Sequence, residues 1–211
     1  MASAVNGTCD PAFTAVRDVF AASIAAGDDL GASVAVFVDG RPVVDLWGGL
    51  ADRKSGRPWE RDTMCVTFSA TKAVTATAAL LLVERGAVSL DAPVAQWWPE
   101  FAAHGKTSVT STMLLTHTAG LPAFDRPISA EQAADFDAMT AQLAGQTPEW
   151  TPGTRHGYHA LTFGWLVGEL VRRHSGLSVG EFVRRELAED LWVGVPPAML
   201  DGLAHIAAAA S

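Results

Sequence analysis

The sequence predicts an α/β fold in which a small β-structure precedes a long helical region. Two β-rich runs flank Asp39-Gly40 in "SVAVFVDGRPVVDLWGG", and this residue pair favours the tight turn of a β-hairpin. From Gly86 onward the apolar spacing is helical, with loops between the segments. A lone hairpin is marginal, and strands this apolar need a wider sheet covered by helices. We therefore expect an α/β sandwich whose sheet is incomplete in this chain.

The N-terminal segments follow from local patterns. Residues 11–27 carry apolar side chains at helical spacing, and Gly27 supplies the C-terminal stop of that helix. The hairpin is expected over residues 33–47. The stretch "TMCVTF", residues 63–68, is either a short buried strand or an extended entry into the next helix.

The second helix begins near Ser69 and ends at Gly86. It is aliphatic apart from two threonines, so we expect it to be buried nearly all round. We assign residues 1–62 to the N-terminal helix and hairpin, and residues 63–211 to a helical subdomain, as parts of one incomplete domain. Further helices are predicted over residues 111–116, 130–143, 160–174 and 179–189.

Composition limits the class of protein. The 211 residues are 49% hydrophobic, which is enough for one domain with a sizeable core. The net charge of −8 and the pI near 5.1 argue against nucleic acid as a partner. The longest apolar run is too short to cross a bilayer. "MASAVNGTCD" has no basic start before an apolar core, so we expect no signal peptide.

Cys9 and Cys65 are too few and too far apart in sequence for a disulfide framework, which favours a reducing cytoplasm. No cofactor motif is complete. "GKTS" at 105–108 ends like a P-loop, but Glu100 stands where the first glycine belongs. We therefore expect no cofactor.

Ser69 and Lys72 form an S-x-x-K motif at the start of the second helix. Residues three apart on a helix share a face, so the Lys72 ammonium can reach Ser69 Oγ. Lysine, unlike arginine, can lose its proton when desolvated, and a serine beside a neutral lysine can perform acyl transfer. The alternative is a serine N-cap followed by a solvated lysine, and the two residues alone leave both open.

Ser178 is a competing nucleophile, because "GLSVG" matches G-x-S-x-G. That motif requires a strand before the serine, whereas the preceding segment is helical with Gly176 as its expected C-cap. Glu181 follows Ser178 by three residues, which is the pattern of a capping box. We interpret Ser178 as a helix cap.

The remaining polar candidates have structural explanations. His156 and His159 lack a nearby cysteine or clear carboxylate partner, so we interpret them as loop or surface residues rather than metal ligands. Tyr158 is the chain's one tyrosine and opens an apolar helix after a Pro-Gly turn. By itself it is explained by a ring in the core and a hydroxyl in water. Trp97, Trp98 and Trp150 fall in predicted loops and could line a pocket.

Taken together, several stretches resemble the serine β-lactamase-related superfamily, in particular class C β-lactamases and family VIII carboxylesterases. The stretches are "FSATK" around Ser69, "LLTHTAGLP" at 114–122, "WTPGTRHGYHALTFGWLVGEL" around Tyr158, and "DLWVGVP" at 190–196. The likeness extends from about residue 15 to residue 197. It implies a β-lactamase/transpeptidase-like α/β sandwich with a helical subdomain, truncated before its C-terminal strands.

The resemblance also implies roles for three residues. Ser69 is the nucleophile that is acylated. Lys72 is the proton acceptor or the group that keeps the base deprotonated. Tyr158 is the general base and then the general acid toward the leaving group. The backbone N–H of Ser69 supplies one oxyanion donor.

Two departures from the family pattern matter. Class C enzymes carry Asn two residues after the tyrosine, whereas this chain has Ala160, which weakens a β-lactamase interpretation and suits the esterases. The family's third motif lies on a strand beyond residue 211. Lys106-Thr107-Ser108 is no substitute, because it precedes the tyrosine and lies in a predicted loop.

We therefore expect a cytoplasmic serine hydrolase that acts on small-molecule esters through an acyl-enzyme on Ser69. It needs no metal and has no nucleic-acid or membrane partner. A β-lactamase or D-alanyl peptidase-like enzyme is one alternative, and an inactive truncated chain that binds another polypeptide is a second. The chain alone should have little activity, because its matched motifs supply one oxyanion donor. The acyl group, the alcohol and the oligomeric state stay open.

Overall fold

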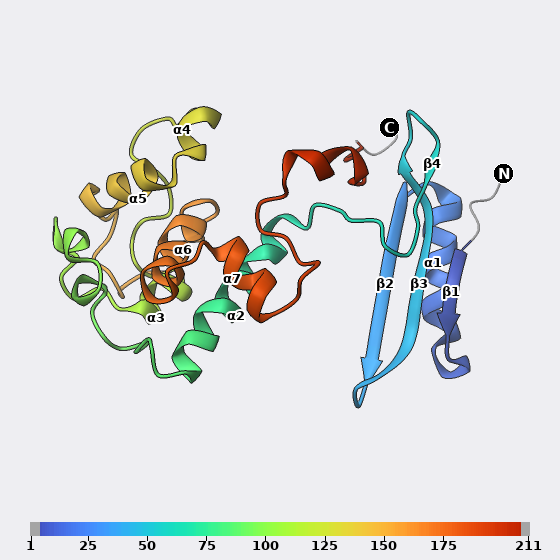
Figure 1. Ribbon diagram of the computed structural model, residues 1–211, viewed down its shortest axis with the longest axis horizontal. Coiled ribbons are helices and arrows are strands. Elements are labelled where there is room, and N and C mark those ends of the chain that lie inside the picture. The colour runs from blue at the N-terminus through green and yellow to red at the C-terminus, as the bar shows by residue number, and fades with distance from the viewer. Residues whose placement is uncertain (1–4, 208–211) are drawn as a thin grey trace. The chain divides into compact units, whose positions relative to one another are not determined.

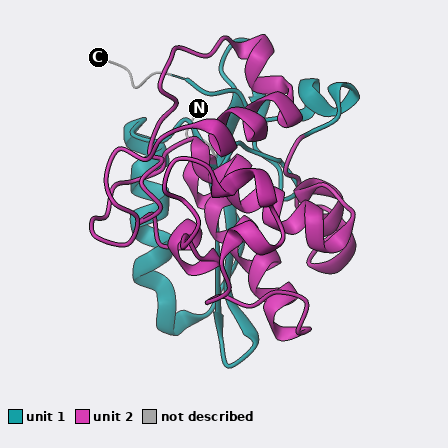
Figure 2. Cartoon of the chain, turned by 90° about the vertical axis from the view of Figure 1, so that its left-hand side faces the viewer, with its two compact units in different colours: residues 1–67, 195–211 teal, residues 68–194 magenta. Residues whose placement is uncertain are grey.

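The computed structural model describes residues 5–207, and the chain divides into two compact units. Unit 1 comprises residues 1–67 and 195–211, and unit 2 comprises residues 68–194 (Figure 2). Each unit has its own internal packing.

Unit 1 is built on an antiparallel sheet with strand order β1-β3-β2. The long pair β2 (Gly31–Val38) and β3 (Arg41–Asp52) is the hairpin that the sequence predicts, although both strands extend beyond residues 33–47. Asp39 and Gly40 at its turn have φ of 50° and 75°, the two positive values of a type I′ turn. A short strand, β4 (Arg57–Pro58), pairs with the end of β3.

The strand β1 (Val5–Cys9) was not predicted from the sequence, so the expectation of a lone hairpin is wrong. Its residues, VNGTC, have weak strand propensity and form a strand because β3 offers an unpaired edge. Gly7 is required at this edge, because an added Cβ would lie 1.9 Å from the Asp45 carbonyl oxygen. Pairing between segments distant in sequence therefore overrides local preference.

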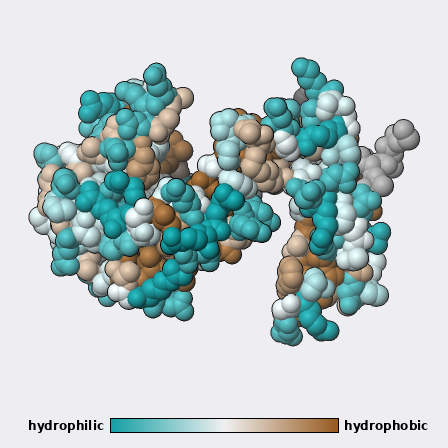
Figure 3. Space-filling view, viewed as in Figure 1, coloured by the Kyte–Doolittle hydropathy of each residue, from teal (hydrophilic) through white to brown (hydrophobic). Residues whose placement is uncertain are grey.

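Helix α1 (Thr14–Ala26) packs on β1 and β3 and ends at Gly27, whose φ is 79° (Figure 1). The predicted helix over 11–27 is confirmed, with its first residues forming a 3₁₀ turn over Pro11–Phe13. The stretch 63–68 is not a buried strand but an extended entry, with Cys65 and Val66 exposed. Figure 3 shows hydrophobic surface on the strands of this unit.

Residues 195–207 belong with the sheet rather than with the helices of unit 2. They include a 3₁₀ segment, Pro197–Gly202. The Arg57 guanidinium donates to the Gly202 carbonyl at 3.1 Å, and the His205 N–H donates to the Ala51 carbonyl at 2.7 Å. These bonds join the end of the described chain to the hairpin.

Unit 2 is helical and centred on α6, which contacts α2, α3, α5 and α7 (Figure 1). The predicted helix over 130–143 is interrupted at Asp135, where ψ is 92°. The Asp135 carboxylate accepts from the Ala138 N–H at 2.9 Å and so starts a new helix. The helices are α2 (Thr71–Glu84), α3 (Ser111–Leu115), α4 (Ala130–Ala134), α5 (Phe136–Gly145), α6 (Thr162–Ser175) and α7 (Val179–Glu186).

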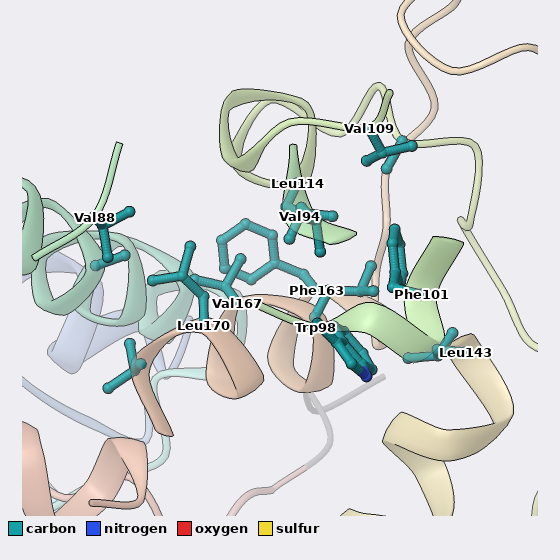
Figure 4. Close-up of a cluster of buried hydrophobic side chains, with 14 of the residues drawn as sticks. Val88, Val94, Trp98, Phe101, Val109, Leu114, Leu143, Phe163, Val167 and Leu170 are labelled. Atoms are coloured by element: carbon teal, nitrogen blue, oxygen red, sulfur yellow. The ribbon is translucent and has the colours of Figure 1, made fainter. Parts of the chain in front are cut away.

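The core of unit 2 joins α2 and α6 to the loop that follows α2 (Figure 4). Trp98 and Phe101 come from that loop and are buried with Phe163 of α6. The α2 helix buries one face, so the expectation of burial nearly all round is wrong: Leu80 remains 48% exposed. The buried side chains follow helical spacing and share one face of α2: Thr75, Ala78, Ala79 and Leu82.

Among residues 5–207, no helix combines the length and the apolar character needed to cross a membrane.

Candidate active site

The site begins at the junction between the extended residues 63–67 and α2. Phe68 has φ of 46°, a left-handed value that is uncommon for a non-glycine residue, and Ser69 follows in the 3₁₀ turn Phe68–Ala70. The N-cap of α2 is Ala70, which makes no side-chain capping bond. Ser69 therefore does not serve as the N-cap that the alternative interpretation required.

Lys72 connects Ser69 to the segment before α6. Its Nζ lies 3.3 Å from Ser69 Oγ and 2.7 Å from the carbonyl oxygen of Ala160, and it donates a hydrogen bond to each. The expected reach from Lys72 to Ser69 is therefore present. Lys72 contacts the main-chain carbonyl of Ala160, a group that every residue has. The sequence therefore gives no indication of this contact.

Tyr158 lies in the segment before α6 rather than in the helix itself, which begins at Thr162. Its side chain is 50% exposed, so the ring is not in the core, and its centroid lies 4.8 Å from Lys72 Nζ. Hydrogen bonds with Ser69 and then with Lys72 lower the pKa of the Tyr158 hydroxyl, because both stabilise the phenolate. The structure thus brings Ser69, Lys72 and Tyr158 into mutual contact.

A cluster of imidazoles surrounds Tyr158. His117 has φ of 60°, and its ring lies 5.2 Å from the Tyr158 ring, 5.9 Å from His156 and 5.5 Å from His159. His117 lies in the stretch "LLTHTAGLP", where no local pattern marks it as a site residue. A polar residue in a left-handed turn next to the tyrosine could not be recognised before the two loops were brought together.

His159 lies in a loop, which was one of the two expected alternatives, but it is not at the surface. His159 is fully buried: its Nδ1 hydrogen-bonds the Gly157 carbonyl at 2.6 Å, and its Nε2 accepts from the Leu121 N–H at 3.0 Å. Burial lowers its pKa, which fits a neutral ring that bridges two loops. His156 is exposed, as expected. Within the described residues, no three His, Cys, Asp or Glu side chains gather as a metal site.

A cavity of about 650 Å³ opens beside Ser69 and lies entirely within unit 2. Its wall is mainly apolar, and Trp97, Trp98 and Trp150 do not contribute to it. The lining includes Phe68, Phe136, Leu161, Phe163, Val179 and Val193. A mainly apolar cavity with a few polar groups is typical of a small-molecule site.

Two other candidates from the sequence are resolved by local geometry. Ser178 is the N-cap of α7 and forms both bonds of a capping box with Glu181, which confirms its interpretation as a cap. Lys106 lies in a loop, as predicted, but it is fully buried and donates to the carbonyl oxygens of Ala103 and Gln146. These bonds connect two segments that are distant in sequence from the S-x-x-K motif.

Comparison with known proteins assigns the family. Residues 16–209 match the family described as Beta-lactamase, and the chain belongs to that family. The esterase/beta-lactamase LipL of Mycobacterium tuberculosis is 40% identical over 199 residues, which are 92% of this chain and 46% of that protein. Such relatives are esterases and β-lactamases, which are serine hydrolases.

Solved structures give the same result. A family VIII carboxylesterase has a TM-score of 0.90 and 40% identity, covering 95% of this chain and 57% of its own. A penicillin-binding protein homolog from Caulobacter crescentus has a TM-score of 0.92 and 40% identity, covering 97% and 56%. These matches confirm the resemblance and the β-lactamase/transpeptidase-like fold class predicted from the sequence. The chain spans about half the length of these relatives.

Proposed function

We propose that this protein hydrolyses small-molecule carboxylic esters through an acyl-enzyme on Ser69. The observation that carries the proposal is the convergence of Ser69 Oγ, Lys72 Nζ and the Tyr158 hydroxyl beside an apolar cavity. The proposal extends to the cytoplasmic location expected from the sequence. The family and the esterase relatives support the reaction class, and the chain's own geometry supports the roles of the residues.

Tyr158 is the base in this scheme. Contact with Ser69 and Lys72 lowers its pKa, which favours the phenolate form that would take the Ser69 proton as Oγ attacks the ester carbonyl. Lys72 donates to Ser69 Oγ and to the Ala160 carbonyl, which holds its positive charge beside the tyrosine. This arrangement favours Lys72 as the group that keeps the base deprotonated rather than as the proton acceptor.

Collapse of the tetrahedral intermediate breaks the bond from the carbonyl carbon to the alkoxy oxygen, and Tyr158 returns the proton to the leaving alcohol. Water then attacks the acyl carbon while Tyr158 takes its proton, the bond from that carbon to Ser69 Oγ breaks, Tyr158 returns the proton to Ser69 Oγ, and the carboxylic acid leaves. The Ser69 N–H, just before α2, supplies one oxyanion donor, and the helix dipole adds to the stabilisation. Loss of one such donor costs about 10²–10³ in rate, so turnover should depend strongly on the position of the Ser69 N–H.

The cavity beside Ser69 receives the apolar part of the ester. Its wall is mainly aromatic and aliphatic, and the charged residues that line it, besides Lys72, are Asp137 and Arg172. Esters with aliphatic or aryl groups are therefore the expected substrates, ahead of polar ones. The Ala160 that replaces the asparagine of class C enzymes favours esters over β-lactams.

Covalent labelling tests the nucleophile without requiring turnover. An alkyl fluorophosphonate should add once to the wild-type chain, at Ser69, as seen by mass spectrometry of the intact protein and its peptides. Ser69→Ala should abolish the adduct, whereas Ser178→Ala should retain it, because Ser178 is occupied in a capping box. An adduct on Ser178, or equal labelling of Ser69→Ala, would overturn the assignment.

A further inference from the structure

The main chain on both sides of Tyr158 is held by a single residue, His117. The Gly157 N–H donates to the His117 carbonyl at 3.1 Å, and the His159 N–H donates to His117 Nδ1 at 3.1 Å. A third bond, from the Ala160 N–H to the Tyr158 carbonyl at 3.0 Å, closes a tight turn within the segment. The residue before the tyrosine and the residue after it therefore share one anchor.

The conformation of His117 makes this double anchor possible. Its left-handed φ of 60° lets the carbonyl and the ring of one residue face the same segment, and histidine and asparagine adopt such values more readily than most residues. The centroid of the His117 ring also lies 5.2 Å from that of the Tyr158 ring and 5.1 Å from that of the Phe163 ring. Tyr158 is half exposed, so burial in the core does not fix its position.

The anchor requires an unprotonated Nδ1, because that atom accepts the bond from the His159 N–H. The ring is partly buried, and the titratable or charged groups that face it are His156, Tyr158, His159 and Lys72. Burial first, and then His159, His156 and Lys72, lower the pKa of His117. These surroundings favour the neutral ring that the geometry needs.

We propose that neutral His117 is a positioning residue that holds Tyr158 against Ser69 and Lys72. The inference rests on the proposed role of Tyr158 as the base. His117 touches neither the substrate nor the reacting atoms in this scheme. It acts by fixing the backbone of the tyrosine, so its loss should change the ionisation of Tyr158 as well as the chemistry.

Tyr158 is the chain's one tyrosine, so its ionisation can be followed directly by the ultraviolet absorbance of tyrosinate in the intact chain. In the wild type it should titrate below the ordinary tyrosine pKa. His117→Leu has no side-chain acceptor for the His159 N–H, so the pKa of Tyr158 should return most of the way to its ordinary value. His117→Asn should keep most of the lowering, because Asn Oδ1 occupies the place of Nδ1 and asparagine tolerates the left-handed φ. His156→Leu is the control, because it removes an exposed imidazole of the same cluster.

Near-ultraviolet circular dichroism establishes that each variant is folded, and His117→Gly replaces the leucine variant if that one does not fold. A folded leucine or glycine variant with wild-type titration of Tyr158 would overturn the proposal, as would an ordinary pKa in the wild type. Failure of the proposed function gives a different result. In that case Ser69 takes no phosphonate, yet the tyrosine titration still responds to His117.

Discussion

The buried Lys106 should make the stability of the helical unit depend on pH. Its side chain is fully buried, and its ammonium donates to the Ala103 carbonyl at 2.9 Å and to the Gln146 carbonyl. It also lies 5.3 Å from the centroid of the Phe101 ring. Carbonyls and a ring provide partial negative charge but no carboxylate, so burial lowers the pKa of Lys106 to about 8.

The sign and size of the effect follow from this pKa. Lysine ordinarily titrates near 10.5, so folding disfavours the protonated form of Lys106. The resulting penalty is complete below pH 8, shrinks as the pH rises, and is gone above the unfolded value. One pH unit corresponds to about 1.36 kcal/mol, so the displacement amounts to at most about 3 kcal/mol.

Denaturant unfolding at pH 7 and pH 10 measures this term. The wild type should gain about 2–3 kcal/mol more stability between the two pH values than Lys106→Met, which has no proton to lose. Lys54→Met removes an exposed lysine and should behave like the wild type, and it controls for the change in net charge. Other titrating groups are common to all three proteins and cancel in the comparison. Equal pH dependence in Lys106→Met and the wild type would refute the reasoning.

Two further predictions concern the candidate site. Lys72→Met removes the cation that keeps the base deprotonated, and Tyr158→Phe removes the proposed base. Each should slow ester hydrolysis and phosphonate labelling by about 10²–10⁴-fold without unfolding the protein, and near-normal rates would exclude that residue from the mechanism. Gly164 lies in the first turn of α6 on the cavity wall, with no atom within 4 Å of an added Cβ, so Gly164→Ala should raise stability by up to about 1 kcal/mol in thermal unfolding. The added methyl should nevertheless slow acylation by bulky esters more than by acetate, whereas Gly145→Ala, also in open space but outside the cavity, should leave the ester preference unchanged. An unchanged preference in Gly164→Ala would show that the substrate does not enter the cavity.

Features that depend on neighbours in the chain were predictable from the sequence. The Asp39-Gly40 turn, the stop of α1 at Gly27 and the capping box of Ser178 each appear where the residues indicate. The proximity of Lys72 to Ser69 belongs with them, because three residues of a helical turn fix that distance. These are short-range consequences of φ preferences and side-chain bonds to the nearby backbone.

Features that depend on distant main-chain groups were decided only by the tertiary structure. Strand β1 forms because β3 offers hydrogen-bonding partners, and Lys72 is held by the carbonyl of Ala160. His117 holds the two residues that flank Tyr158, far along the sequence, by accepting from the His159 N–H at its ring nitrogen and from the Gly157 N–H at its carbonyl. Every residue has a main-chain carbonyl, so the sequence does not indicate which carbonyl will accept a hydrogen bond from a given side chain. The sequence determined which groups can do chemistry, and the meeting of two loops decided how they are held.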